Sequence, residues 1–317
     1  MNTFENLFLN NKIIKKYSNG VISLIEDDYH DNFGFQWNQF NKLQLDSFNG
    51  SNESLDRLLF QSKLKEGDFK DKLVLELGAG NGRFTEILLK LGAKVVAVDY
   101  STAINANYQN HKSYVNDNKL MLVRGSLFDL PLKKEIFDIV ICYGVIQHTG
   151  NNKGCLDTIS EYVKKDGLLL VDIYSNSIKH FNPFIYLIRP FFFRISGERK
   201  KLRVVENFVN KVFPLQLKVL GYLHDRKGIF KYLKFVINRS PNSVYGINLY
   251  LDGKISVKHA KDWSICDTYD AWMPKHDHPV SMRKWRKLLN NLAIQKGFDV
   301  MNVFECGQGN AAVLKKT

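Results

Sequence analysis

Apolar and polar residues alternate in short blocks from residue 72 to residue 173. Continuous apolar runs at Lys72–Leu77 (KLVLEL) and Lys94–Val98 (KVVAV) predict buried strands, because a strand covered on both faces has no polar side. Between them, Phe84–Leu91 (FTEILLKL) has apolar residues at helical spacing, and Gly92 closes that helix. The same patterns predict the other elements of this region: strands at Leu120–Arg124, Phe137–Tyr143 and Leu168–Ile173, a helix from about Asn152 to Lys165, and Ser101 as the N-cap of the helix after the second strand.

The regular alternation stops after residue 173 and resumes near the end of the chain. Ser281 is a good N-cap for MRKWRKLLNNLAIQKG, whose apolar residues form one stripe, and Gly297 ends that helix. Val300–Glu305 and Ala311–Lys315 then flank the turn-rich sequence CGQGN, which predicts a closing antiparallel hairpin.

Strands that alternate with helices in this way predict an α/β fold with a doubly wound, mostly parallel sheet. We expect a Rossmann-like sheet of seven strands with an antiparallel last strand. Residues 71–175 and 280–317 would form this α/β domain, residues 1–70 an N-terminal extension or lid, and residues 176–279 a basic, aromatic insertion after the fifth strand. Both additions should lie near the carboxyl ends of the strands, where such sheets bind ligands.

Charge is distributed unevenly along the 317 residues, which carry a formal net charge of +13. Between Asn176 and Asp262 there are 17 Lys and Arg against 5 Asp and Glu, a net of +12. A basic surface favours phosphorylated or acidic substrates, nucleic acid or an anionic membrane. A surface that is merely rich in solvated lysine is the alternative interpretation.

The four cysteines, at positions 142, 155, 266 and 306, form no C-x-x-C pair. Neither a zinc ribbon nor a disulfide framework is indicated, and a reducing compartment is the simpler interpretation. The N-terminus is a poor signal peptide. The most apolar stretch, Phe181–Ser196, is interrupted by Pro and Arg and is too short to span a bilayer. We therefore expect a soluble, cytoplasmic protein.

Candidate chemistry centres on the glycine loop in LVLELGAGNGRF, residues 73–84. The dinucleotide fingerprint is G-x-G-x-x-G, but here the glycines follow G-x-G-x-G, and Arg83 stands where the last glycine of that fingerprint would be. The carboxylate of Glu76 would repel a pyrophosphate but suits a cationic amine. S-adenosylmethionine carries such an amine and a sulfonium, and has no phosphate. Asp99, 17 residues after Gly82, can accept both ribose hydroxyls of an adenosine.

With these motifs the sequence resembles the class I S-adenosylmethionine-dependent methyltransferases. The resemblance covers VLELGAGNGRFTEILLKLGAKVVAVDYS, LVRGSLFDLPL, FDIVICYGVIQHT and KKDGLLLVDIY. More narrowly, FGFQW, VIQHT and DTYDAWMPKHDHP resemble a subgroup found in bacterial polysaccharide and secondary-metabolite pathways. Members of that subgroup commonly begin with a zinc-ribbon-like module, whose metal cysteines are absent here, so no zinc is expected.

The resemblance implies a role for each cofactor-binding position. Glu76, Gly78, Ala79, Gly80 and Gly82 would surround the methionine part of S-adenosylmethionine. Asp99 and Tyr100 would hold the ribose, Ser126 and Leu127 would border the adenine, and Tyr143 and Gly144 would lie beside the methyl group. The family usually has an acid at the position of Ser126, and a serine accepts a hydrogen bond from the adenine amine more weakly.

Methyl transfer needs an aligned nucleophile, and a base when that nucleophile is a hydroxyl or a cationic amine. His148, in YGVIQHTG after the fourth strand, is the best-placed base. Its alternative role is a loop-fixing hydrogen bond or a wall of the adenosine pocket.

A second cluster, in CDTYDAWMPKHDHP, contains Asp267 and His276 as candidate catalytic residues. The cluster can form a substrate wall, or simply pack as a loop. His276-x-His278 with a carboxylate is reminiscent of a metal site, but no further ligand is suitably spaced, and no metal is expected. The aromatic residues Phe33, Phe35 and Trp37 can close as a lid, although packing onto the sheet is the favoured role.

The leading hypothesis is methyl transfer to a small-molecule or saccharide acceptor, at oxygen and with an anionic group on the acceptor. A nucleic-acid methyltransferase that uses the basic insertion is a rival, but YGVIQH is neither N/D-P-P-Y nor a P-C nucleophile motif. A catalytically silent cofactor-binding subunit is another. Membrane contact would be peripheral at most, through IYLIRPFFFRI, with a cap helix buried on its own domain as the alternative. The sequence does not indicate the oligomeric state.

Overall fold

The computed structural model describes residues 4–9, 15–16, 20–25, 32–177, 182–274, 277–307 and 309–317. The chain divides into two compact units. The sheet unit comprises Met1–Asn41, Glu53–His180 and His276–Thr317, and the helical unit comprises Lys42–Asn52 and Phe181–Lys275. The second unit therefore includes a short piece of the N-terminal region as well as the long insertion.

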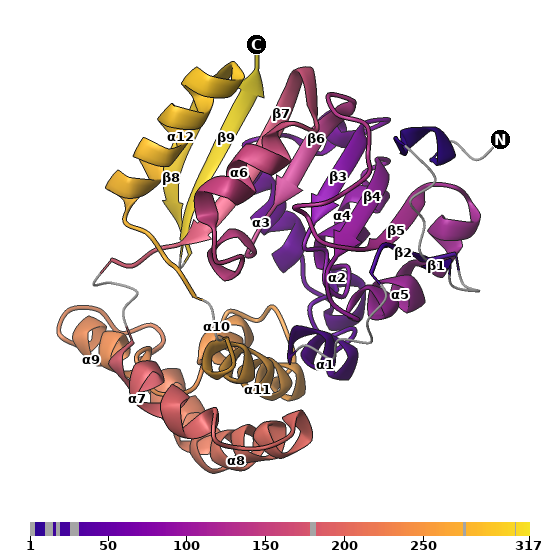
Figure 1. Cartoon of the computed structure of the whole chain (residues 1–317). Coiled ribbons are helices and arrows are strands. Elements are labelled where there is room, and N and C mark those ends of the chain that lie inside the picture. Colours follow the sequence, from indigo (N-terminus) through magenta and orange to yellow (C-terminus); the bar gives the residue numbers. More distant parts are fainter. Residues whose placement is uncertain are drawn as a thin grey trace. The chain divides into compact units, whose positions relative to one another are not determined.

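In the described parts of the chain, one sheet contains nine strands in the order β1-β2-β5-β4-β3-β6-β7-β9-β8 (Figure 1). Strands β3, β4, β5, β6 and β7 are parallel to one another, and β9 is antiparallel to both β7 and β8. The strands are β1 (Lys15–Lys16), β2 (Ile22–Ser23), β3 (Leu73–Leu77), β4 (Lys94–Asp99), β5 (Leu120–Arg124), β6 (Phe137–Cys142), β7 (Val163–Tyr174), β8 (Phe298–Cys306) and β9 (Gly309–Lys316).

The predicted α/β class, the mostly parallel sheet and the antiparallel last strand are confirmed. The predicted number of seven strands is wrong, because the N-terminal region adds β1 and β2. These are two strands of two residues each, and β2 extends the sheet by pairing parallel to β5. Such short edge strands leave no sequence pattern long enough to recognise.

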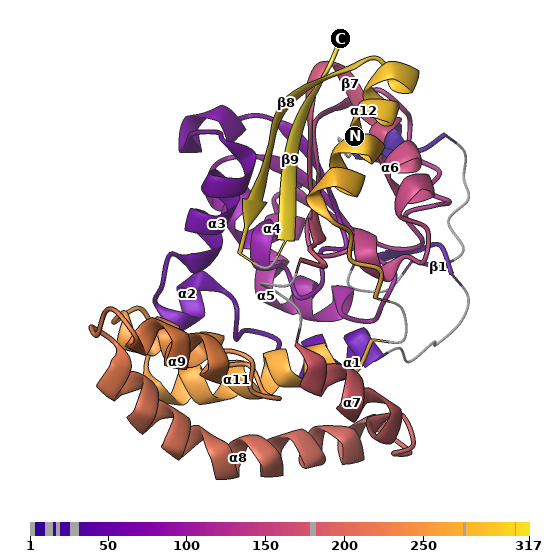
Figure 2. The ribbon, with the colours of Figure 1, turned by 90° about the vertical axis from the view of Figure 1, so that its left-hand side faces the viewer.

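Two hydrophobic cores cover the two faces of the sheet. Alternate residues of one strand enter different cores: Leu75 and Leu77 of β3 lie in one, and Val74 lies in the other. Figure 2 shows the helices of the two faces, with α3 (Glu53–Ser62) and α4 (Arg83–Lys90) on one side and α6 (Asn152–Ser160) and α12 (Met282–Lys296) on the other. This burial on both faces explains the continuous apolar runs of the strands.

The helix boundaries differ from the predictions at two places. Ser101 is not the N-cap of α5 (Ile104–Asn116); the N-cap is Ala103, and the Ser101 hydroxyl donates to Asp99 over 2.6 Å. The helix predicted to reach Lys165 ends at Ser160, because Val163 already pairs with Phe137 in the sheet. At α12 the prediction is confirmed: the side chain of Ser281 accepts from the Lys284 amide, and the helix ends at Gly297 with a positive φ of 67°.

The helical unit contains six of the described helices. Its core includes Trp263, Tyr269 and Phe192, and the indole of Trp272 donates to the Pro241 carbonyl over 2.9 Å. The N-terminal piece packs into this unit through Phe48, whose ring lies 5.3 Å from that of His259. The helices are α2 (Asp46–Asn49), α7 (Pro183–Phe192), α8 (Glu198–Leu223), α9 (Phe230–Ile237), α10 (Tyr245–Leu251) and α11 (Val257–Trp272).

No helix among the described residues is long and apolar enough to cross a membrane. The segment CDTYDAW, read from sequence as irregular, is the last part of α11. The sequence shows no amphipathic stripe there because buried residues point to more than one side of that helix: the four consecutive residues 263–266 are all buried.

Candidate active site

The glycine loop connects β3 to α4 and depends on three glycines with positive φ. The φ values are 76° at Gly78, 54° at Gly80 and 93° at Gly82, a region that side chains other than glycine rarely adopt. A Cβ at Gly78 would lie 2.1 Å from Val145 Cγ2, and one at Gly82 would lie 2.6 Å from Asn107 Oδ1. The loop therefore needs glycine for both conformation and space, which leaves bare backbone at the carboxyl end of β3.

Asp99, the last residue of β4, ties this loop to the neighbouring strand. Its Oδ2 accepts from the Gly80 amide over 2.8 Å, and its Oδ1 accepts from the amide and the hydroxyl of Ser101 over 2.8 and 2.6 Å. Burial raises the pKa of the Asp99 carboxyl, and these donors oppose the rise. The structure thus brings together the two features that the sequence singled out, the glycine loop and the acid after the second predicted strand.

Glu76 lies beneath the loop and is 3% exposed. Its carboxylate accepts from Thr85 Oγ1 over 2.5 Å, and Asn107 Nδ2 donates to the same hydroxyl over 2.9 Å. His111 Nδ1 lies 2.9 Å from Asn107 Oδ1, and burial lowers the pKa of His111 to about 4, so its ring is neutral and donates. This chain of polar groups holds the start of α4 against the end of β3.

Burial also raises the pKa of Glu76 from 4.5 to about 8, opposed by the hydrogen bond from Thr85. The folded state therefore holds this proton more tightly than the unfolded chain does. The contribution of Glu76 to stability is complete below pH 4.5 and is lost as the pH rises through about 8.

We expect Glu76→Gln, which can still accept from Thr85 but cannot ionise, to remove this part of the pH dependence. The free energy of unfolding of wild type minus that of the variant should fall across the pH window from 4.5 to about 8. Denaturant titrations at a series of pH values measure it. Parallel curves for the two proteins would contradict the assignment, and because the titration of Asp99 is common to both, it largely cancels.

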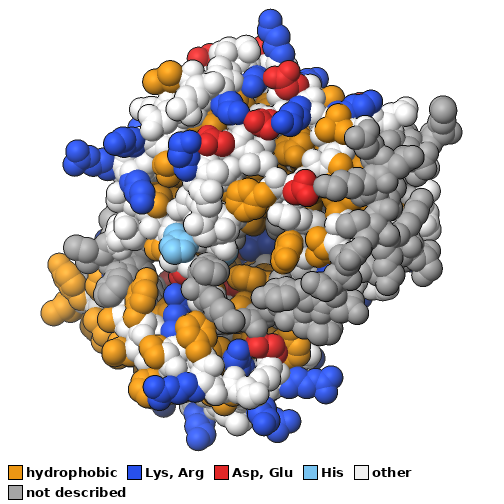
Figure 3. All heavy atoms as spheres, viewed as in Figure 1, with side chains coloured by type: hydrophobic (Ala, Val, Ile, Leu, Met, Phe, Trp, Pro, Cys, Tyr) orange, Lys and Arg blue, Asp and Glu red, His pale blue; other side chains and the backbone are white. Residues whose placement is uncertain are grey.

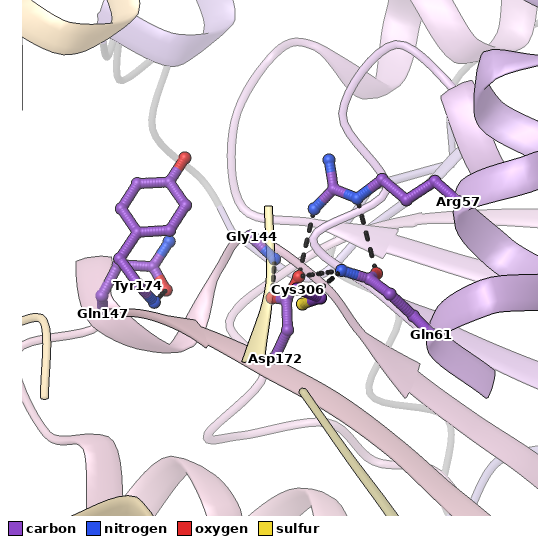
Figure 4. A network of polar contacts seen from close by, with 7 residues as sticks. All are labelled: Arg57, Gln61, Gly144, Gln147, Asp172, Tyr174 and Cys306. Atoms are coloured by element: carbon purple, nitrogen blue, oxygen red, sulfur yellow. Dashed lines mark hydrogen bonds and ion pairs between the residues drawn. The ribbon is translucent and has the colours of Figure 1, made fainter. Parts of the chain in front are cut away.

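A second polar network lies at the ends of β6 and β7 (Figure 4). Asp172 of β7 is 3% exposed, and its Oδ1 accepts from the Gly144 amide over 2.5 Å. Its Oδ2 accepts from Arg57 Nη2 over 3.0 Å and from Gln61 Nε2 over 3.2 Å, both from α3. Gln61 Nε2 also lies 3.1 Å from the sulfur of Cys306. Asp172 thus links the backbone of Gly144, which is predicted to border the methyl group, to α3 of the N-terminal region.

Sequence reasoning missed this network. One signal was available: Asp172 ends an apolar strand in LLLVDIY, as Glu76 and Asp99 end theirs. Arg57 and Gln61 gave none, because they precede Asp172 by 115 and 111 residues. Interaction with the Asp172 carboxylate raises the pKa of Arg57, whereas burial alone, the largest single influence, would lower it.

His148 ends the short helix η3 (Ile146–His148), which follows β6. Its ring centroid lies 5.6 Å from that of Tyr174 at the end of β7 and 5.4 Å from that of Phe33. The neighbouring Gln147 is fully buried; its Oε1 accepts from the Tyr174 amide over 3.4 Å, and its Nε2 has no partner within the described residues. His148 therefore stands at the carboxyl edge of the sheet, among aromatic rings.

The aromatic motif FGFQW lies on α1 (Asn32–Gln39), within the sheet unit. Besides the contact of Phe33 with His148, the indole of Trp37 would lie 3.7 Å from a Cβ at Gly80. The helix thus reaches both the glycine loop and the β6 edge, which is compatible with a packing role and with a lid.

The other predicted cofactor residues also follow strand ends. Ala79 is buried, Tyr100 is half exposed, Ser126 and Leu127 follow β5, and Tyr143 follows β6. Ser126 Oγ accepts from the Phe128 amide over 3.3 Å, and the hydroxyl of Tyr143 is buried with no partner among the described residues. Together with the glycine loop they line up along the carboxyl edge of β3, β4, β5 and β6.

The second predicted cluster lies only partly within the described residues. Asp267 lies on α11 of the helical unit, where it accepts from Ser243 Oγ over 3.3 Å. His276 lies outside the described residues. No group of three or more His, Cys, Asp or Glu in the described part of the chain is arranged to hold a metal ion.

Comparison with known proteins finds a methyltransferase domain in one part of the chain. Residues 75–171 match a family model described as "Methyltransferase domain". This segment contains the glycine loop, Asp99, His148 and the first part of β7. The match covers less than half of the chain and agrees with the prediction from the glycine loop, a methyltransferase domain with S-adenosylmethionine as its cofactor.

Among curated proteins, the chain is 30% identical over 135 residues to the tRNA U34 carboxymethyltransferase of Ruthia magnifica subsp. Calyptogena magnifica, covering 42% of this chain and 41% of the relative. It is 31% identical over 112 residues to the mitochondrial ubiquinone biosynthesis O-methyltransferase of Schizosaccharomyces pombe, covering 35% and 40%. The chain thus spans about two fifths of the length of these relatives. A solved structure, magnesium protoporphyrin IX methyltransferase from Synechocystis PCC 6803, is 12% identical with a TM-score of 0.44, covering 90% of this chain and 84% of that one.

Proposed function

We propose that the whole protein is an S-adenosylmethionine-dependent methyltransferase that acts on a hydroxyl of a small-molecule or saccharide acceptor. One observation carries the proposal: the loop with Gly78, Gly80 and Gly82 is hydrogen-bonded to Asp99 and lies on the same sheet edge as His148. The carboxylate of Asp99 beside this loop suits the ribose hydroxyls of an adenosine ligand, and His148 supplies a base. The O-methyltransferase name of one relative supports oxygen as the methylated atom.

The chemistry needs little beyond alignment. The methyl carbon of the sulfonium is attacked in line by the acceptor oxygen, the carbon–sulfur bond breaks, and the neutral thioether S-adenosylhomocysteine leaves. The protein has to hold the acceptor oxygen opposite the carbon–sulfur bond and to accept the proton of the acceptor hydroxyl. We propose His148 as that base, Gly144 and Tyr143 as the wall beside the methyl group, and Phe33 as part of the acceptor wall. Asp267 and His276 remain proposed acceptor contacts.

Isothermal titration with S-adenosylhomocysteine tests the cofactor half of the proposal. We expect micromolar or tighter binding with none for NAD⁺, and transfer of label from methyl-labelled S-adenosylmethionine to a hydroxylated acceptor in a panel of phenols and nucleotide-linked sugars. Tight binding of NAD⁺ with none of S-adenosylhomocysteine would refute it. Cofactor binding without transfer to any acceptor of the panel would favour a catalytically silent subunit instead.

For His148 we expect a specific kinetic defect. His148→Ala should lower kcat about 100-fold with an accepted acceptor, because loss of a general base costs roughly 10²–10⁴ in rate. It should leave the affinity for S-adenosylhomocysteine within a few-fold of that of the wild type. His224→Ala, at a half-exposed histidine of the helical unit, is the matched control and should change neither. Unchanged turnover in His148→Ala would show that another group accepts the proton.

A second candidate function is modification of tRNA, favoured by the printed name of one relative and by the 17 Lys and Arg against 5 Asp and Glu between Asn176 and Asp262. It requires tRNA binding that weakens steeply with salt, since each phosphate contact releases counterions. Filter binding with total tRNA over a salt series distinguishes it from the leading proposal. We also propose that the protein belongs to the subgroup of polysaccharide enzymes and that it is cytoplasmic. Identification of the acceptor tests the first of these two proposals.

A further inference from the structure

Helix α9 presents its apolar stripe to solvent. Ile229, Tyr232, Leu233 and Val236 recur at the i, i+3, i+4, i+7 spacing, and they are 77%, 75%, 46% and 64% exposed. None of the residues of α9 is buried. In a globular protein this spacing marks the face that packs on the core, so α9 has the pattern of a core helix with the stripe turned outward.

Helix α7 of the same unit repeats the arrangement. Phe184, Leu187 and Phe191 lie at i, i+3 and i+7, and they are 47%, 66% and 68% exposed. The two helices are joined locally: Asn182 caps the start of α7 and donates to the Ser240 carbonyl just after α9, over 2.9 Å. Figure 3 shows hydrophobic side chains gathered over the part of the surface where α7 and α9 lie. We call these two stripes the apolar face of the helical unit.

The charge along the two segments that form the apolar face is basic. The chain contains no Asp or Glu from Ile173 to Gly197, or from Arg226 to Leu251. Arg226 and Lys227 precede α9, and Arg239 follows it. The guanidinium of Arg226 lies 3.9 Å from the ring centroid of Tyr222, and that of Arg239 lies 3.4 Å from the ring centroid of Phe235. Cations therefore border an apolar, aromatic surface, and the acids next to these two segments in sequence are Asp172, Glu198, Asp225 and Asp252, which lie just outside them.

This combination selects one partner among those that a basic surface can have. Nucleic acid offers phosphates and bases that stack on aromatic rings. It has no aliphatic surface that would bury the exposed side chains of Ile229, Leu233, Val236 and Leu187. An anionic bilayer offers both parts: acyl chains for the aliphatic stripe and phosphate headgroups for the cations, with Tyr and Phe at the boundary between them. We propose that the helical unit docks onto anionic phospholipid membranes through α7 and α9, which lie in the interface without crossing it.

Flotation of the full chain with vesicles tests the docking. We expect the protein to float with vesicles of phosphatidylcholine mixed with phosphatidylglycerol, and to stay at the bottom with phosphatidylcholine alone. The double variant Ile229→Ser/Val236→Ser should reduce partitioning by roughly tenfold or more, since each buried methylene contributes to interfacial binding. Lys227→Gln/Lys231→Gln should reduce it by about 25-fold at low salt, at about fivefold for each basic residue near the headgroups.

The matched control is Ile294→Ser. Ile294 is 85% exposed on α12 of the sheet unit, so this variant removes an exposed isoleucine outside the apolar face and should float like wild type. Equal flotation of all variants would overturn the proposal. A wild-type protein that binds no vesicles but self-associates with rising concentration would also overturn it, if Ile229→Ser/Val236→Ser abolishes the self-association. The apolar face would then join two copies of the chain.

The docking does not depend on the proposed methyl transfer. A chain that floats with anionic vesicles but fails to bind S-adenosylhomocysteine would refute the proposed function and leave the docking in place. A chain that binds S-adenosylhomocysteine but does not float with vesicles would refute the docking and leave the proposed function in place. The substituted residues belong to the helical unit and are not among the proposed cofactor or catalytic residues, so the variants should bind S-adenosylhomocysteine as wild type does.

Discussion

Gly78→Ala is expected to raise the dissociation constant of S-adenosylhomocysteine by at least about 100-fold, because a loop shift should lose one or two charge-assisted hydrogen bonds. The new methyl group would lie 2.1 Å from Val145 Cγ2, whereas carbon atoms in contact are about 3.5–4.0 Å apart. The loop must therefore move away from η3. Such a movement should also disturb the bond from the Gly80 amide to Asp99, which holds the two predicted cofactor elements together. Titration calorimetry measures the change.

Gly253→Ala provides the matched control. Gly253 has a φ of 72°, close to the 76° of Gly78, but a Cβ there has nothing within 4 Å. Both variants carry the cost of a left-handed alanine, about 1–2 kcal/mol, and only Gly78→Ala adds the clash. Gly253→Ala should thus be mildly destabilised with normal cofactor affinity. If Gly78→Ala binds S-adenosylhomocysteine like this control, the loop is not the binding element.

Asp172→Ala is expected to lower the free energy of unfolding by about 3–5 kcal/mol, the range seen when one partner of a buried ion pair is removed. The substitution leaves the guanidinium of Arg57, the amide of Gln61 and the Gly144 N–H without their shared acceptor. Denaturant unfolding measures the loss. The loss of the hydrogen bond to Gly144 should also reduce the rate of methyl transfer more than the affinity for the cofactor, since this residue is proposed to border the methyl group.

Two variants separate the buried pair from ion pairs in general. Asp166→Asn breaks the surface pair with Lys315, whose nitrogen lies 3.1 Å from an Asp166 oxygen that belongs to a 69% exposed side chain. It should cost at most about 1 kcal/mol. Arg57→Met added to Asp172→Ala should recover part of the lost stability, because it removes the uncompensated charge. A double variant as unstable as the sum of both single variants would contradict the pairing.

The elements that sequence patterns predicted well are those whose partners are close in the chain. Strands β3, β4 and β5 match to within one residue because burial on both faces gives each a continuous apolar run. The contact of Gly80 with Asp99 spans 19 residues and follows from one strand–helix–strand unit. Arg57 and Asp172 are 115 residues apart, and nothing local at Arg57 indicates its partner.

The helical unit escaped the sequence patterns for two physical reasons. Pro190 and Pro214 lie inside α7 and α8, where a proline is ordinarily taken as a helix boundary. In α9 the apolar stripe is turned away from the protein, so the usual inference from periodicity to a buried face gives the wrong side.

The short N-terminal piece of the helical unit has a practical consequence. Since residues 42–52 group with residues 181–275, the polypeptide passes between the units at four points: after 41, 52, 180 and 275. A chimaera that exchanges residues 181–275 alone would leave Phe48 without the ring of His259 and give the incoming segment a foreign neighbour. Exchanging the helical unit between related chains therefore calls for grafting both segments together, and evolutionary exchange of this unit is constrained in the same way.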